Sequence, residues 1–302
     1  MLYSTAGVGV GAPRLTRDQT FHQLASRLAL RFEKSANRTR MFIDAQQPPW
    51  AVIRAFPGEG GGALVHLNNV SGGVVAGDCL SLSVNVGPGS IAQVTTTGAT
   101  RLYRHRADSQ ESEERIELNV AEGALLEYLP DAIIPFAGSR HRQSTSITLA
   151  DSATFLWWDI LAPGRQAMGE SFAYERLRIR TEVRSPNRPL LLENLALEPA
   201  TRPLTSLARL GGYTHRANFY AFKVGLPSKM WRELELNLSE ICSDQSRPGC
   251  IIWGATTLVA DGVAVQGLSV SGRELPATLT ACWKLARRFL TGTEAVPPRK
   301  VY

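Results

Sequence analysis

Three stretches in the middle of the chain repeat one arrangement of strand, small-residue turn and second strand. In each stretch, aliphatic or branched residues two positions apart precede a turn that contains Gly or Ser. The three stretches are Leu80–Val94, Ile116–Tyr128 and Ser146–Trp157. Repetition of such a two-strand unit is typical of stacked β-units, and a plain antiparallel β-sandwich gives similar alternation. The sequence therefore predicts a mainly β fold, with many short strands in a layered or β-helix-like body.

The segments on either side of the repeat predict more strands and about two helices. Alternation begins at Ser26, where Leu28, Leu30 and Phe32 share one side of a strand. Near the other end, Asp261-Gly262 lies between two β-rich runs and indicates a hairpin.

Both predicted helices lie in the C-terminal part. The first runs from Ser228, a candidate N-cap, to about Ile241. The second spans roughly Ala277–Leu290 and ends at Gly292. Its apolar stripe consists of Leu279, Trp283, Ala286 and Leu290, and its solvent-facing side of Lys284, Arg287 and Arg288.

Composition limits the classes of protein that remain. The chain has 302 residues, of which 44% are hydrophobic and 20% charged, as expected for a folded protein. We expect a flexible N-terminal tail over residues 1–20 and a single domain over 21–302. The net charge of +6 is scattered along the chain, which disfavours nucleic-acid binding. No apolar run is long enough to span a membrane, and the N-terminus lacks the pattern of a secretory signal. Four cysteines without a CxxC pair fit a cytoplasmic protein.

Catalytic and metal-binding motifs are absent from the sequence. It contains no GxxxxGK[ST] phosphate loop, no HExxH pair and no GxSxG elbow. No two of its five histidines have helical i,i+4 spacing, so we predict no stable metal site. His66 and Cys79 lie near Asp78 in sequence, and they are secondary candidates only.

Three acidic residues, Asp78, Asp131 and Glu170, stand out. Asp78 and Glu170 each follow a segment rich in glycine, and Asp131 follows Leu129-Pro130. Glycines are costly in strands unless close backbone approach or a positive φ is needed. Turn chemistry explains the same pattern, since Asp and Gly are ordinary turn residues. In a β-helix hydrolase or lyase, Asp78 and Glu170 would instead serve as an acid/base pair.

Four motifs in series resemble the UreD/UreH family of urease accessory proteins. They are a Gly-Gly-x-x-x-Gly-Asp segment, a Thr-Thr-x-x-Ala-Thr-x-x-Tyr-Arg segment, a Leu-Pro-Asp loop and a Gly-Arg-x-x-x-Gly-Glu segment. They lie within Asn69–Leu82, Ala92–Arg104, Glu127–Arg140 and Gly164–Phe172. The resemblance is strong over about residues 27–175 and looser elsewhere.

The resemblance implies a non-enzymatic maturation factor for urease. It implies a complex with a UreF-type protein, which holds a UreG-type GTPase, and docking of this assembly on apo-urease for GTP-dependent nickel insertion. It also implies no permanently bound cofactor, with nickel only in transit through this chain. A stand-alone nickel metallochaperone is a further alternative, although the chain lacks the His-rich tail that commonly binds nickel.

A nickel passage requires ligands that bind a dication weakly enough to release it. Separated carboxylates meet this requirement. Asp78 and Glu170 are the preferred candidates to line the passage, with Asp131 third. His66, Cys79, Thr97 and Arg101 are secondary candidates.

Overall fold

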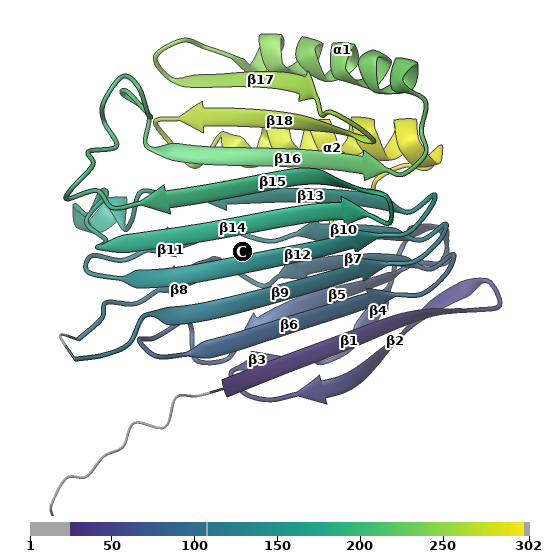
Figure 1. The fold of residues 1–302 in the computed structure, drawn as a ribbon, viewed down its shortest axis with the longest axis horizontal. Helices are drawn as coiled ribbons and strands as arrows, with labels where there is room; N and C mark the ends of the chain where they lie inside the picture. The colour runs from purple at the N-terminus through teal and green to yellow at the C-terminus, as the bar shows by residue number, and fades with distance from the viewer. Residues whose placement is uncertain (1–24, 107, 299–302) are drawn as a thin grey trace, which may run out of the picture.

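Two β-sheets stacked face to face form most of the molecule, and two helices cover part of one of them (Figure 1). The computed structural model describes residues 25–106 and 108–298. The tail predicted for residues 1–20 therefore lies outside the described residues. None of the described helices is long and apolar enough to cross a membrane.

The first sheet has seven strands and faces the viewer in Figure 1. Its five inner strands pair in parallel, and its first and last strands in spatial order are antiparallel to their neighbours. In spatial order they are β15 (Arg188–Leu197), β14 (Arg176–Ser185), β12 (Arg140–Leu149), β9 (Ser112–Val120), β6 (Cys79–Val86), β1 (Ala25–Ser35) and β2 (Arg38–Gln46).

The second sheet has eleven strands; part of it lies behind the first, and the rest extends beyond the first at the top of Figure 1. Its central path is β17 (Ile251–Thr257), β18 (Gly262–Ser269), β16 (His215–Lys223), β13 (Thr154–Leu161), β10 (Leu125–Leu129), β7 (Ile91–Thr96), β5 (Ala63–Asn69) and β3 (Trp50–Ala51). Three short strands branch from it: β4 (Ala55–Pro57), β8 (Thr100–Leu102) and β11 (Ile133–Pro135). Two single turns of 3-10 helix, Glu59–Gly61 and Gln166–Met168, lie in loops.

The repeat predicted from the sequence is confirmed as three stacked units. Each unit places its first strand in the seven-stranded sheet and its second in the eleven-stranded sheet: β6 with β7, β9 with β10, and β12 with β13. Equivalent strands of successive units pair in parallel. This parallel stacking favours the β-helix-like prediction over a plain antiparallel sandwich.

The main core lies between the two sheets. Along β9 every second side chain is buried, ending with Ile116, Leu118 and Val120. Along β13, Phe155 and Trp157 point into the same space, and their rings stack with a centroid separation of 6.5 Å. Alternation of period two therefore fixes which side chains reach the interior.

Helices α1 (Ser228–Gln245) and α2 (Leu275–Thr291) pack on the outer face of the eleven-stranded sheet and form a second core with it. The predicted stripe of α2 is confirmed, because Leu279, Trp283, Ala286 and Leu290 are all buried. The predicted end at Gly292 is also confirmed, since this residue adopts a φ of 68° and its N–H bonds the carbonyl of Arg288.

Two predictions about the helices are wrong. Ser228 is the first helical residue and not the cap, because Pro227 occupies the N-cap position without a side-chain hydrogen bond. Arg287 is 3% exposed and does not face solvent. Its Nη1 lies 2.7 Å from Oε2 of Glu127 on β10, which also accepts from Trp283 Nε1 through Oε1 at 2.7 Å. A charge partner 160 positions away in sequence keeps this cation buried.

Candidate functional site

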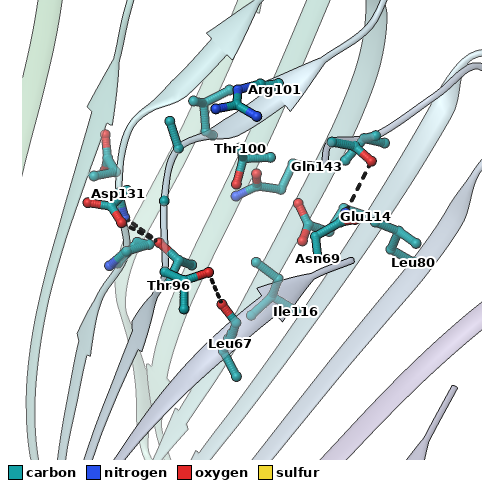
Figure 2. Close-up of a pocket in the computed structure, with 18 of the residues that line it drawn as sticks. Leu67, Asn69, Leu80, Thr96, Thr100, Arg101, Glu114, Ile116, Asp131 and Gln143 are labelled. Carbon is teal, nitrogen blue, oxygen red and sulfur yellow. Dashed lines mark hydrogen bonds between the residues drawn. The ribbon is translucent and has the colours of Figure 1, made fainter. Parts of the chain in front are cut away.

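A cavity of about 260 Å³ lies between the two sheets, at the edge where strands of one sheet end and strands of the other sheet begin. The eleven-stranded sheet contributes the carboxyl ends of β5, β7, β10 and β13, and the seven-stranded sheet the beginnings of β6, β9 and β12. The rim is formed by the segment 72–74 and by the segment 97–101. Figure 2 shows polar side chains from both sheets around this space.

Backbone proximity closes one side of the rim. A Cβ added to Gly73 would lie 2.6 Å from the carbonyl oxygen of Arg101 and 2.6 Å from Cε2 of Tyr103. Val74 N–H in turn donates to that Arg101 carbonyl at 2.8 Å. The two rim segments can meet this closely only because residue 73 has no side chain.

Three carboxylates from different parts of the chain line the cavity: Glu114, Asp131 and Asp159. The remaining polar lining consists of neutral oxygen and nitrogen groups and one exposed guanidinium: Asn69, Thr96, Thr97, Thr100, Tyr128, Gln143, Thr145 and Arg101. Oxygen ligands of this kind suit hard or borderline divalent cations.

Glu114 lies on β9 and is 7% exposed. Burial raises the pKa of its carboxyl to about 7, because the charged form loses hydration. Its Oε2 lies 4.0 Å from Nε2 of His141 on β12. Burial lowers the pKa of His141 to about 3, so this imidazole is neutral and does not compensate the carboxylate charge. Ser112 lies beside them, with its Oγ 2.9 Å from His141 Nδ1.

Asp159 lies near the end of β13, on the face that points between the sheets. Burial raises the pKa of its carboxyl to about 6, while the charge of Arg216 acts in the opposite direction. Asn218, directly across on β16, donates its side-chain N–H to Asp159 Oδ1 at 3.0 Å. The charge of this carboxylate is therefore only partly compensated within the protein.

Asp131 lies immediately after β10 and faces Thr96 at the end of β7 (Figure 2). The Thr96 hydroxyl donates to Asp131 Oδ2 at 3.0 Å and accepts from the Asp131 backbone N–H at 2.8 Å. Thr97 and Arg101 also line the cavity, and the Arg101 guanidinium donates to the carbonyl of Gly72 at 3.4 Å. Three of the residues singled out from the sequence thus meet at one cavity.

Asp78 and Glu170 lie outside the cavity lining. Asp78 closes a turn: its Oδ2 accepts from Val75 N–H at 2.9 Å, and its carbonyl accepts from Glu113 N–H at 2.8 Å. Glu170 pairs with Arg165 and accepts from Ala137 N–H at 3.2 Å. The hydrogen bond from Arg165 lowers the pKa of Glu170. Among the described residues, Asp78 and Glu170 share no hydrogen bond with each other.

His66 and Cys79 are likewise not part of the cavity lining. The His66 ring lies on β5 and meets Phe56 edge to face, with ring centroids 5.8 Å apart. Cys79 is the half-buried first residue of β6. Across residues 25–106 and 108–298, no group of three or more His, Cys, Asp or Glu side chains is arranged to hold a metal ion.

Sequence reasoning missed Glu114 and Asp159, although the strand pattern contains a signal for both. Glu114 is in phase with Ile116 and Leu118, and Asp159 is in phase with Phe155 and Trp157. A carboxylate at the inward position of an alternating strand is either paired or functional, because burying an unpaired charge is costly.

Comparison with known proteins places the chain in a family. A family model described as UreD urease accessory protein matches residues 25–302. A protein of Herpetosiphon aurantiacus named urease accessory protein UreD is 40% identical over 275 residues, which cover 91% of this chain and 96% of that protein. Proteins with the same name from Alkalilimnicola ehrlichii (33% over 272 residues, 90% and 89% covered) and Cenarchaeum symbiosum (32% over 252 residues, 82% and 85% covered) are also similar. This chain belongs to the UreD family of urease accessory proteins.

Proposed function

We propose that the chain is a cytoplasmic scaffold for urease maturation and that the cavity between its sheets is part of the passage by which nickel reaches apo-urease. The observation that supports this function is the placement of Glu114, Asp131 and Asp159 around one internal space. A cation in this space would meet carboxylates one after another. Binding at each would be weak enough for release, because no closed ligand set surrounds the ion.

In this proposal a partner protein, and not this chain, hydrolyses the GTP that drives nickel insertion. In the proposed complex, a UreF-type protein binds this chain and holds a UreG-type GTPase, and the assembly docks on apo-urease. The GTPase provides nucleotide hydrolysis, for which this sequence has no phosphate-binding loop. The chain binds no permanent cofactor, and nickel is its cargo.

The test is to replace each cavity carboxylate by its amide in cells that contain urease and all accessory proteins. We expect Glu114→Gln, Asp131→Asn and Asp159→Asn each to lower the nickel content of urease several-fold under limiting nickel. The complex recovered per cell stays unchanged, because the amides keep the shape of the side chains. Glu117→Gln is the matched control, since Glu117 lies on the same strand as Glu114 but faces solvent.

Two measurements on the same cells decide the outcome: nickel per urease active site and complex recovered per cell. Normal nickel content in all three cavity variants would refute the passage. Asp78→Ala and Glu170→Ala belong in the same experiment, because both residues remain candidates for the approach to the cavity. For them, parallel loss of nickel and complex indicates a turn role, and loss of nickel alone indicates a place on the path.

A further inference from the structure

A second cavity, of about 360 Å³, lies next to the first and differs from it in chemistry. Its wall is mostly aliphatic or aromatic, and its charged members are two arginines, Arg209 and Arg216. The two cavities meet along β13: Asp159 lines the first and Leu161 the second. These residues share the inner face of the strand and are separated by about 7 Å, two residues of strand rise.

Arg216 occupies the boundary between the cavities. On β16 it stands directly across from Leu161, one pleat away from the Asp159 and Asn218 pair. Its guanidinium reaches across the interior and pairs with Glu193 on β15 of the other sheet. The charge of Asp159 also acts on Arg216, as does that of Glu193. The Arg216 guanidinium is thus influenced by two carboxylates, that of Glu193 on the opposite sheet and that of Asp159 on the neighbouring strand.

The partners of Arg216 leave ligands available at the boundary. Glu193 is held in place by the Tyr220 hydroxyl, which donates to its Oε2 at 2.9 Å. Asn218 is fully buried, and its Oδ1 has no hydrogen-bond partner among the described residues. Besides Asp159, this boundary therefore contains an unused carbonyl oxygen and a carboxylate fixed by a phenol.

We propose that Arg216 is an electrostatic gate of the nickel passage: Glu193 holds its guanidinium one pleat away from Asp159, where its positive charge keeps the binding of a divalent cation at Asp159 weak. The proposal rests on the function proposed above. A dication and a guanidinium repel each other and compete for the same carboxylate. Because the ion pair with Glu193 holds Arg216 in place, its charge stays beside Asp159 when a metal binds there, and the metal is released more readily.

Two single substitutions should act in opposite directions on nickel binding. Arg216→Gln removes the competing cation and leaves Asp159 and Glu193 uncompensated, so the chain in complex with its UreF-type partner should bind Ni²⁺ at least tenfold more tightly. Glu193→Gln removes the ion pair that holds Arg216 and leaves Asp159 as the acidic group on the neighbouring strand to attract it, so Ni²⁺ should bind several-fold more weakly. Arg216→Lys keeps the charge and should behave like the parent. Equilibrium dialysis of the purified complexes against Ni²⁺ measures all four.

The opposite signs separate gating from simple damage to the fold, since loss of packing would weaken binding in both variants. If Arg216→Gln yields no complex, Glu193→Gln carries the test alone, and unchanged Ni²⁺ affinity in it overturns the gate. Equal affinity of parent and Arg216→Gln also overturns it. The passage itself is tested separately by Asp159→Asn: lost nickel delivery in that variant, with unaltered Ni²⁺ affinity in the Arg216 and Glu193 variants, rejects the gate and keeps the passage.

Discussion

Individual buried charges determine how this protein responds to pH. Glu114 has a pKa of about 7 in the folded chain, above the ordinary value of 4.5, because burial penalises its charged form. The folded state therefore holds a proton on this residue that the unfolded state releases between about pH 4.5 and 7. The contribution of the protonated carboxyl to the free energy of unfolding is therefore fully present below about pH 4.5, and it is lost as the pH rises to about 7.

Glu114→Gln should remove that loss. Relative to the parent, we expect the free energy of unfolding of the variant to rise by about 3 kcal/mol between pH 4 and pH 8, as a pKa of about 7 in place of 4.5 implies. Urea titrations of both proteins at several pH values measure the difference. His141 has the opposite pH dependence, but it is present in both proteins and its contribution cancels in the comparison. A difference that does not change with pH would contradict the assigned environment of Glu114.

The ion pair of Glu127 and Arg287 predicts a large effect of a single substitution. Arg287→Met leaves a buried carboxylate that keeps hydrogen bonds only from Trp283 and, at 2.9 Å, from Gln93. Breaking a buried pair from one side costs about 3–5 kcal/mol. The double variant Glu127→Gln, Arg287→Met should recover much of this loss, since no charge stays buried. Arg288→Met on the exposed side of the same helix should stay within about 0.5 kcal/mol of the parent in thermal or urea unfolding.

Residue-level roles were the hardest to predict from the sequence. Arg287 follows the helical period of a solvent-facing residue, and only its distant partner Glu127 explains its burial. Glu114 and Asp159 have no glycine-rich flank, and the signal for them is their phase with the inward-facing side chains of their strands. Asp131, which stands out in the sequence as an acidic residue after Leu129-Pro130, lies at the cavity together with Thr97 and Arg101. Which carboxylates share a space depends on pairing between strands, which a single sequence does not specify.

At the scale of elements, local signals were sufficient. The strand–turn–strand units, the hairpin around Asp261-Gly262 and both C-terminal helices follow from periodicity and turn residues, and the structure confirms them. Boundaries were less accurate: α1 begins without a side-chain cap and continues to Gln245, beyond the expected end near Ile241. The helix is held by the sheet beneath it, where Trp231, Leu234 and Leu238 are buried, so its ends depend on packing more than on capping.

The end of α2 provides an element-scale prediction. Gly292 has a φ of 68° with no atom near a prospective Cβ, so Gly292→Ala introduces backbone strain without a clash. We expect a loss of about 1 kcal/mol in the free energy of unfolding. Gly254 on β17 also has open space around a prospective Cβ but no positive φ. Gly254→Ala is therefore the control and should cost nothing. Equal effects of the two substitutions would argue against the left-handed C-cap.

At the scale of the whole molecule, an exposed edge strand affects whether the chain aggregates without a partner. Strand β2 ends the seven-stranded sheet and exposes Phe42 and Ile43, which are 40% and 42% exposed. An exposed apolar edge strand is a template for association with another chain. We expect the chain alone to aggregate, co-expression with a UreF-type protein to raise its soluble yield, and Ile43→Lys to reduce self-association in light scattering. A chain that stays monodisperse at high concentration without a partner would contradict this expectation.

The proposed division of labour predicts that the purified chain hydrolyses neither GTP nor urea. Its sequence has no phosphate-binding loop, and in the part of the chain that the structure describes no three His, Cys, Asp or Glu side chains are arranged to hold a metal ion. Phosphate release from GTP and ammonia release from urea are the two assays, with the whole set of accessory proteins and urease as the positive control. Activity that stays with this chain through several columns would contradict the assignment.

The stacking of parallel strands gives the interior a regular step length. In the eleven-stranded sheet β7, β10 and β13 are successive parallel neighbours, and Thr96, Asp131 and Asp159 lie near the carboxyl ends of these three strands in the same order. Hydrogen-bonded strands are spaced by about 4.8 Å, so polar groups placed one per strand follow one another at intervals set by the backbone. An ion moving across the strands would exchange one ligand for the next at nearly constant intervals. Inserting or deleting a whole strand–turn–strand unit would change the number of such steps, but it would not change their length.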